Sequence, residues 1–267
     1  TAKKTSTAKK PASTAKKTTS GTKKAASKKT APVVENVAPI VEETAPVVEE
    51  TAPVVEETAP VVEETAPVFD ISTLPRRSVA FIGSECHPFV KTGGLGDVMY
   101  ALPRELARLN CDVRVILPRY ACIPQEYQDK MVYRGEFYMD LGNTGRNYYV
   151  GIMEYVNDGV VYDFIDNQEF FSSGNPYLNL VDDIPRYCFF SKAALAALNY
   201  MNWIPDIVHC HDWQTGLIPV LLKDKFHEGE FFRDMKSVIT IHNLKFQGVW
   251  DVKTVRDITG LPAYYPG

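Results

Sequence analysis

The sequence lacks several features that would place it in a specialised class of protein. No apolar run approaches the ~18 residues that a membrane helix needs, and the first residues contain no apolar signal-peptide core. The number of cysteines is odd, and none of the five forms a CxxC pair: Cys86, Cys111, Cys122, Cys188 and Cys210. We therefore expect no membrane partner and no disulfide framework, but reduced and buried cysteines in a cytoplasmic protein.

The first 29 residues lack acidic, aromatic and branched aliphatic side chains, and they contain ten lysines. Such a segment cannot bury enough apolar surface to offset the entropy of ordering, so residues 1–29 are predicted to be a disordered basic tail. A solvated tether is the favoured interpretation. Contact with nucleic acid, with an acidic partner or with the acidic repeat that follows is the less favoured one. A transit peptide would also lack acids, but this tail has neither arginine nor amphipathic spacing.

Residues 31–70 lack basic side chains and contain nine glutamates and one aspartate. They repeat every seven residues, as in "TAPVVEE", and a period of seven is typical of coiled coils. A proline in each repeat removes a helix donor and excludes that structure: Pro32, Pro39, Pro46, Pro53, Pro60 and Pro67. We predict an extended, semi-rigid linker over residues 30–76.

Residues 77–267 have the composition of a folded domain. The chain is 45% hydrophobic, which is enough to bury a core. Because the two N-terminal segments carry equal and opposite formal charges, the net charge of −4 belongs to the rest of the chain. Such a mildly acidic domain does not indicate nucleic-acid binding.

Strand-like and helix-like segments alternate in this domain, which predicts an α/β fold with a doubly wound, mostly parallel sheet. Apolar residues at helical spacing over 96–110 predict a helix that bends at Pro103 and carries the stripe Val98, Leu102, Leu106 and Leu109. The other expected helices cover 184–201 and 213–226, and the expected strands cover 78–83, 112–118, 148–156, 160–166, 206–210 and 236–242. Ligands of such sheets bind beyond the carboxyl ends of the strands.

A glycine-rich stretch, "KTGGLGD", follows the first predicted strand. Gly93, Gly94 and Gly96 would let the backbone approach a ligand closely, and a helix that opens near Gly96 offers free N–H groups to a diphosphate. Lys91 adds a positive charge just ahead of them. The spacing matches no established phosphate-binding pattern, so a phosphate site and a plain strand-to-helix turn both stay open.

Two further predicted strands end in polar side chains, in "HCHDW" and in "TIHNLKFQG". His209, His211 and Asp212 are metal-ligating types, but neighbouring residues alternate between the faces of a strand and no further ligand cluster is present. We therefore expect no metal. His242 is predicted at the carboxyl end of its strand. Two such ends in one sheet favour a polar cleft.

"KTGGLGDV", "PDIVHCHDWQTGLIP" and "TIHNLKFQG" together resemble three N-terminal signatures of bacterial glycogen synthases and plant starch synthases. The resemblance covers residues 77–267 and implies the N-terminal, Rossmann-like half of a GT-B glycosyltransferase, with a missing C-terminal domain as its partner across the cleft. It implies glucose transfer from ADP-glucose to the non-reducing 4-OH of an α-1,4-glucan, with retention of configuration. No cofactor or metal is implied, and a plant or algal source would imply a plastid location.

The resemblance also implies roles for individual residues. Lys91 and the backbone of Gly93, Gly94 and Gly96 resemble the ADP-glucose-binding loop, and Asp97 would face the sugars. Asp212 matches an aspartate important for activity, and His242 matches the active-site histidine that contacts the donor glucose. Tyr177, in "NPY", resembles a residue of a loop close to the donor, although so short a stretch is also typical of an ordinary turn.

Some features depart from the family pattern. Cys210 replaces an alanine and Gln214 replaces the last histidine of the family's "HAHDWH", for which we expect an altered activity rather than a lost one. No second carboxylate pairs obviously with Asp212, so the two-carboxylate scheme of retaining glycosidases is not expected. Three alternatives stay open: a non-catalytic glucan- or nucleotide-binding module, an interaction protein whose tail dominates, and a related GT-B enzyme that uses UDP-glucose.

Overall fold

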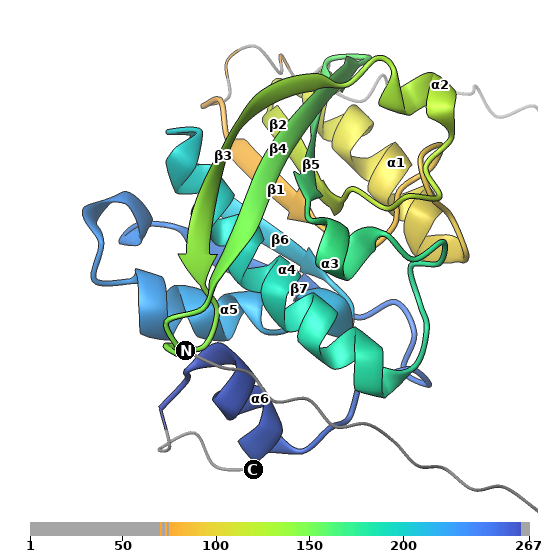
Figure 1. Ribbon diagram of the computed structural model, residues 1–267. Coiled ribbons are helices and arrows are strands. Elements are labelled where there is room, and N and C mark those ends of the chain that lie inside the picture. Colours follow the sequence, from red (N-terminus) through yellow and green to blue (C-terminus); the bar gives the residue numbers. More distant parts are fainter. Residues whose placement is uncertain (1–69, 71–72, 74, 263–267) are drawn as a thin grey trace, which may run out of the picture. The chain divides into compact units, whose positions relative to one another are not determined.

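A seven-stranded sheet organises the computed structural model, which describes residues 70, 73 and 75–262 (Figure 1). The strand order is β3-β4-β5-β2-β1-β6-β7. The predicted basic tail, most of the predicted linker and the last five residues lie outside the described residues.

Five strands of the sheet are parallel: β1 (Ser78–Ile82), β2 (Asp112–Pro118), β5 (Val160–Asp166), β6 (Ile207–His211) and β7 (Lys236–Thr240). The near-continuous apolar runs of β1, β2 and β5 suit strands that are covered on both faces, whereas β7 is largely exposed. Each of these five strands corresponds to a predicted strand. Three boundaries differ: β1 ends one residue early, β6 lies one residue later than expected, and β7 ends at Thr240, so that His242 lies two residues beyond it.

The other end of the sheet is antiparallel and was predicted only in part. β4 (Asn147–Asn157) corresponds to a predicted strand, whereas β3 (Val132–Asp140) was missed. Most β3 side chains are at least partly exposed, so the strand lacks the apolar run that marks its neighbours. A bulge falls between Tyr133 and Gly135, and Gly135 adopts a φ of 133°, a backbone conformation that favours glycine.

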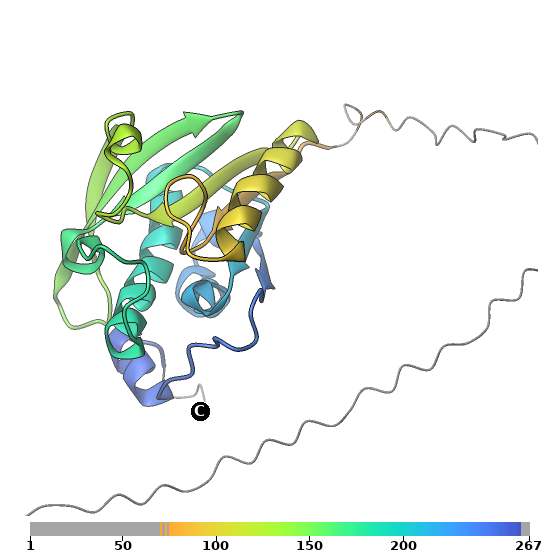
Figure 2. The same cartoon turned by 90° about the vertical axis from the view of Figure 1, so that its right-hand side faces the viewer.

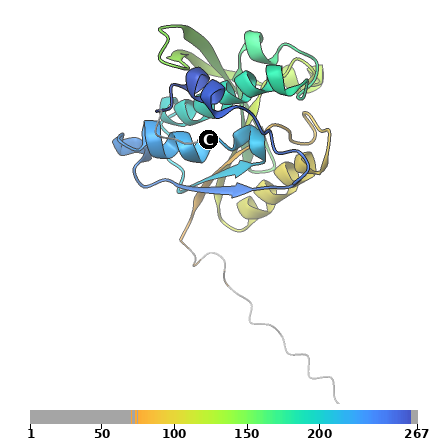
Figure 3. The same ribbon diagram turned by 90° about the horizontal axis from the view of Figure 1, so that it is seen from below.

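Helices cover both faces of the sheet, as the doubly wound prediction requires. Figure 3 shows α1 (Gly94–Arg108) on one face and α4 (Leu180–Tyr200), α5 (Ile218–Leu221) and α6 (Val252–Thr259) on the other. α4 begins four residues before the predicted start because the Asn179 side chain accepts a hydrogen bond from the Asp182 N–H (3.2 Å) and caps the helix.

The buried face of α1 differs from the predicted one. Leu95, Met99 and Pro103 are buried, whereas Leu102 and Leu109 are exposed. The helix begins two residues earlier than expected, at Gly94, and continues past Pro103 to Arg108. The predicted stripe was therefore wrong by one residue along the helix, because the buried face runs through Leu95, Met99 and Pro103 at helical spacing.

The region predicted as one helix over 213–226 is broken into three short pieces. A 3₁₀ turn, η2 (Trp213–Thr215), precedes α5, and a π-helical turn, η3 (Leu222–Phe226), follows it. The remaining short helices are α2 (Gln125–Gln128), α3 (Gln168–Phe171) and η4 (Glu230–Phe232), which were not predicted. Residues 241–251 then run without regular structure from β7 to α6 (Figure 2).

All five cysteines are free thiols, as expected. Cys86, Cys188 and Cys210 are buried, but Cys111 is only partly buried and Cys122 is exposed, so the prediction of burial was wrong for Cys122. Within residues 75–262, no helix is both long and apolar enough to cross a bilayer.

Candidate active site

The three polar stretches predicted from the sequence follow neighbouring parallel strands, β1, β6 and β7. Their carboxyl ends meet at one edge of the sheet, where a cavity of about 1060 Å³ opens. A cavity of this size at the ends of parallel strands is the usual place for a ligand in a doubly wound fold. Its lining residues are Glu85, Thr92, Gly93, Gly94, Leu95, Val98, Tyr177, Leu178, Asn179, Leu180, Asp183, Asp212, Trp213, Gln214, His242, Asn243, Lys245, Phe246, Gln247, Gly248 and Val249.

The glycine-rich loop is held in place by a buried carboxylate that the sequence analysis did not select. Glu85, only 2% exposed, accepts hydrogen bonds from the Thr92 backbone N–H, from the Thr92 hydroxyl (2.8 Å) and from the Gly93 N–H (3.3 Å). The Gly93 amide therefore already has an acceptor. Helix α1 begins at the next residue, Gly94, with no side-chain cap at its start, and Gly94 lines the cavity.

Lys91, Gly96 and Asp97 lie beside the cavity and do not line it. Lys91 Nζ forms an ion pair with Asp97 Oδ1 (2.7 Å), and both side chains are about half exposed. The Lys91 side chain also packs over Gly96, where an added Cβ would lie 2.9 Å from Lys91 Cγ. Gly96 therefore allows the lysine to cross the start of α1, which is a packing role rather than a demonstrated ligand contact.

Asp212 links the ends of β6 and β7. Its N–H donates to the Thr240 carbonyl (2.9 Å), and its Oδ1 accepts the backbone N–H of His242 (2.7 Å). Its backbone has φ 58° and ψ −174°, a region that non-glycine residues adopt at a cost of about 1–3 kcal/mol. Strain of this kind is concentrated at functional sites, and here it places a nearly buried carboxylate against the loop that carries His242.

Three histidine rings lie in contact at the same place. The ring centroids of His209 and His211 are 4.2 Å apart, and those of His211 and His242 are 5.2 Å apart in a stacked arrangement. His211 Nδ1 and His242 Nε2 are hydrogen-bonded at 2.9 Å, whereas His209 Nε2 is bonded to the Thr240 hydroxyl at 2.7 Å. Burial, followed by the neighbouring histidines, lowers the pKa of His211 to about 3 and also lowers the pKa of His209 through burial and His242.

Buried side chains hold the loop that contains Tyr177 in place. Tyr177 lines the cavity and its hydroxyl is hydrogen-bonded to Ser84 Oγ (2.8 Å), while burial raises the pKa of the phenol above its usual range. Arg186, 3% exposed, donates to the Pro176 carbonyl (2.9 Å), and Tyr187 donates to the same oxygen (2.5 Å). These hydrogen bonds therefore fix the "NPY" segment, which forms part of the cavity wall. Arg186 was missed, although a single arginine in the apolar run "IPRYCFF" is a signal that could have found it.

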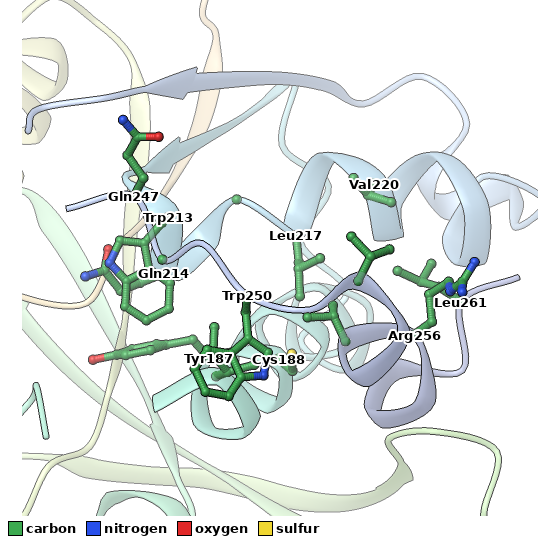
Figure 4. Close-up of a pocket in the computed structure, with 15 residues that line it drawn as sticks. Tyr187, Cys188, Trp213, Gln214, Leu217, Val220, Gln247, Trp250, Arg256 and Leu261 are labelled. Carbon is green, nitrogen blue, oxygen red and sulfur yellow. The ribbon is translucent and has the colours of Figure 1, made fainter. Parts of the chain in front are cut away.

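A second, smaller cavity of about 380 Å³ shares lining residues with the first. Figure 4 shows this smaller cavity. It lies between α4, α5 and α6 and is lined mainly by apolar side chains, among them Leu217, Val220, Trp250 and Leu261. Trp213 and Gln214 line both cavities, and Gln214 Oε1 is buried with no hydrogen-bond partner among the described residues. Across residues 75–262, no group of three or more histidine, cysteine, aspartate or glutamate side chains is arranged to hold a metal ion.

Comparisons with known proteins match the part of the chain that contains these stretches. The sequence model described as "Starch synthase catalytic domain" matches residues 78–266. The chain belongs to the family of starch synthase catalytic domains. A glycogen synthase from Lachnospira eligens is 53% identical over 189 residues, and one from Lachnoclostridium phytofermentans is 51% identical over 189 residues.

The relatives also show how much of a longer fold this chain represents. Each alignment covers 71% of this chain and 39% of the relative, so the chain spans about two-fifths of the length of the curated relatives it matches. A solved structure, the catalytic domain of starch synthase IV from Arabidopsis thaliana bound to ADP and acarbose, matches with a TM-score of 0.61 and 31% identity, over 70% of this chain and 38% of that one. The fold is the Rossmann-like half of a GT-B glycosyltransferase, as the sequence predicted.

Proposed function

We propose that this chain is the N-terminal half of a glucosyltransferase that transfers glucose from ADP-glucose to the non-reducing 4-OH of an α-1,4-glucan, with retention of configuration. The observation that carries the proposal is the cavity at the ends of β1, β6 and β7, into which the strained Asp212 holds His242 by its backbone. Membership of the family and the ADP and acarbose named for the Arabidopsis relative support the choice of a nucleotide sugar and a glucan.

In the proposed reaction the bond between the anomeric carbon and the diphosphate breaks, and a new bond forms to the acceptor 4-OH on the same face of the sugar. The proton of the acceptor hydroxyl passes to the leaving diphosphate. The protein then contributes orientation and electrostatic stabilisation rather than a nucleophile. His242 would contact the donor glucose, and the start of α1, with Lys91 beside it, would contact the diphosphate.

The carboxylates of the cavity suit this scheme better than a glycosidase scheme. Glu85, Asp183 and Asp212 all line the cavity, so further carboxylates are present after all. Asp183 accepts the Leu178 N–H (2.9 Å) and forms an ion pair with Arg186. Glu85 is already occupied by hydrogen bonds from Thr92 and Gly93, and Asp212 by the His242 N–H. Each carboxylate thus holds a loop, whereas a retaining glycosidase needs one free as a nucleophile and one free as an acid.

A chimera tests the proposal. Residues 78–266 would replace the matching segment of the Lachnospira eligens glycogen synthase, with which they share 53% identity. We expect the chimera to release ADP and to lengthen glycogen when it is given ADP-glucose, and to use UDP-glucose less well. Because the chain spans 39% of that relative, we expect it to be inactive by itself.

The control is the same chimera with His242→Ala. A chimera that unfolds cooperatively but turns over no nucleotide-glucose would contradict the proposal. If such a chimera still sedimented with glycogen, a non-catalytic glucan-binding module would replace it. Preference for UDP-glucose would instead favour a related enzyme with that donor.

A further inference from the structure

The histidine rings at the ends of β6 and β7 form a contact in which the donor and acceptor can be assigned. His211 is fully buried, and its ring stacks on Phe81 with a centroid distance of 5.6 Å. Its Nδ1 lies 2.9 Å from His242 Nε2, and its Nε2 has no hydrogen-bond partner among the described residues. His242 is only partly buried and lines the large cavity.

Two neutral imidazoles that share a hydrogen bond need one proton between them, and two arrangements are possible. In the first, His242 donates through Nε2–H and His211 carries its proton on Nε2, which leaves a buried N–H without an acceptor. In the second, His211 donates through Nδ1–H and its Nε2 is a bare acceptor. Orphaned buried N–H groups are rarer in proteins than under-satisfied acceptors, which favours the second arrangement.

We propose that His211 is a positioning residue that donates a hydrogen bond from Nδ1 to His242 Nε2 and thereby fixes the ring orientation and the tautomer of His242. The inference rests on the proposed function only for its catalytic consequence. His211 is well placed for this task because its backbone N–H donates to the Thr215 hydroxyl (2.7 Å), which in turn donates to the His211 carbonyl (2.8 Å). Burial keeps the ring neutral by lowering its pKa to about 3.

The consequence falls on His242. Since its Nε2 accepts a hydrogen bond, its proton must lie on Nδ1 in the neutral ring. His242 then offers an N–H donor to an oxygen atom in the cavity, whether a sugar hydroxyl or a phosphate oxygen, and cannot act there as a base. Asp212 fixes the backbone of His242, and His211 fixes its ring. The two contacts together define the direction in which this donor points.

The tautomers can be read directly from the chain itself by long-range ¹H–¹⁵N correlation spectra of protein labelled on histidine nitrogens. The sequence has five histidines, so single variants can assign each ring. At pH 7 we expect His211 and His242 both to show the pattern of a proton on Nδ1. A proton on Nε2 of His211 would overturn the proposal, and this result does not depend on any enzymatic activity.

Matched substitutions test the catalytic consequence in the chimera. His211→Asn keeps an N–H donor near the Nδ1 position, whereas His211→Leu removes it. We expect Leu to lower kcat roughly 10-fold, as for one lost hydrogen bond, with little change in the KM for donor, and Asn to restore most of the rate. His209→Gln is the control, because His209 is bonded to Thr240 and not to His242.

The outcomes separate the two proposals. Equal kcat for the wild type and for the Leu variant would overturn the positioning role, as would unchanged His242 nitrogen shifts in the Leu variant. A chimera with no turnover at all would contradict the proposed function, and the tautomer spectra would still decide the assignment of His211.

Discussion

Two clusters of titratable side chains lie on the same sheet, and the cost of burying them is reduced in different ways. On β2, β4 and β5, the fully buried Asp163 pairs with Arg114 (3.1 Å), which also lies 3.6 Å from Glu154. On β6 and just after β7, the rings of His209, His211 and His242 form a chain of contacts, and none of the described acids is bonded to them. The first cluster balances charge with charge, whereas in the second cluster burial lowers the pKa of His209 and of His211.

The difference shows which cluster serves structure and which faces a ligand. A charged pair whose atoms satisfy one another has nothing left for a third molecule, and it lies away from both cavities. The histidine cluster leaves one ring open to the large cavity and places next to it a strained aspartate. Perturbed groups in a cleft are candidates for function, whereas perturbed groups in a satisfied ion pair are commonly structural.

The largest effect is expected for His242→Ala in the chimera. Loss of one preorganised contact to the reacting sugar typically costs about 10²–10³ in kcat. Stability should change little, because His242 is only partly buried. Steady-state kinetics per folded molecule, with the melting temperature beside them, measure both quantities. A near-normal kcat with a lowered melting temperature would show that His242 only supports the strand end.

Arg114→Met should have the opposite effect, a large loss of stability with little change in activity. Removing Arg114 leaves Asp163 buried and unpaired, and breaking a buried pair costs about 3 kcal/mol of unfolding free energy at the low end of its range. We take the low end because the Arg114 side chain is 21% exposed. Urea unfolding of this chain measures the loss. The double variant Arg114→Met with Asp163→Asn is the control and should recover part of it; activity in the chimera should stay normal per folded molecule.

Lys91→Ala tests a third kind of charge, a half-exposed ion pair with Asp97. If Lys91 leaves Asp97 to bind a diphosphate, its loss should weaken donor use by about 1.5–3 kcal/mol, the range for a hydrogen bond to a charged group. Kinetics of the chimera with varied ADP-glucose measure this effect. Asp97→Asn is the matched control for the ion pair itself, and an unchanged kcat/KM for Lys91→Ala would make Lys91 a surface charge.

The two clusters should also give opposite dependences of stability on pH. Burial raises the pKa of Asp163 to about 6, above the ordinary value near 3.9, so its contribution is present at low pH and is lost as pH rises through 6. The depressed pKa of His211, about 3, works the other way: its contribution is present above about 6.5 and is lost as pH falls.

Urea unfolding between pH 4 and 7 of single variants separates these contributions. Asp163→Asn should make the loss of stability on acidification steeper, and His211→Asn should make it shallower. Identical pH dependence in both variants and in the wild type would show that neither group titrates differently in the folded and unfolded states.

The smallest effect is expected outside both clusters. Deleting residues 1–70 should leave the unfolding transition of this chain and the spectra of its histidines unchanged, because the segment has no core-forming pattern. Loss of a cooperative transition would contradict the predicted disorder. A shift of DNA mobility that requires residues 1–29 would instead support a nucleic-acid role for the basic tail.

The sequence predicted those parts of the molecule that depend on local pattern. Apolar runs identified every parallel strand, and polar residues after them identified one edge of the sheet. β3 could not be recognised because an exposed edge strand has no such run, and α6 was missed because it is short and mainly polar. The face of α1 was wrong because the predicted helix began at Gly96 and so left out Leu95, the first residue of the buried stripe.

Five of the predicted site residues lie around one cavity, whereas Lys91, Gly96 and Asp97 lie beside it, and none of the contacts between these residues was predicted. Asp212, His242, Tyr177, Gly93 and Gly94 all line the cavity, as expected for one cleft. Glu85 holds the glycine-rich loop through a residue 7 positions away, and His211 bonds to a residue 31 positions away. Such contacts become visible only when the strands lie side by side.

β7 has a consequence for how the chain behaves in solution. It is the last strand of the sheet, and Val238 and Ile239 are each 45% exposed, with Leu244 and Phe246 exposed in the loop that follows. An open strand edge with apolar side chains is a template for pairing with another chain. Concentrated preparations should therefore self-associate through this edge, and a lysine at Val238 should raise the concentration at which light scattering first increases.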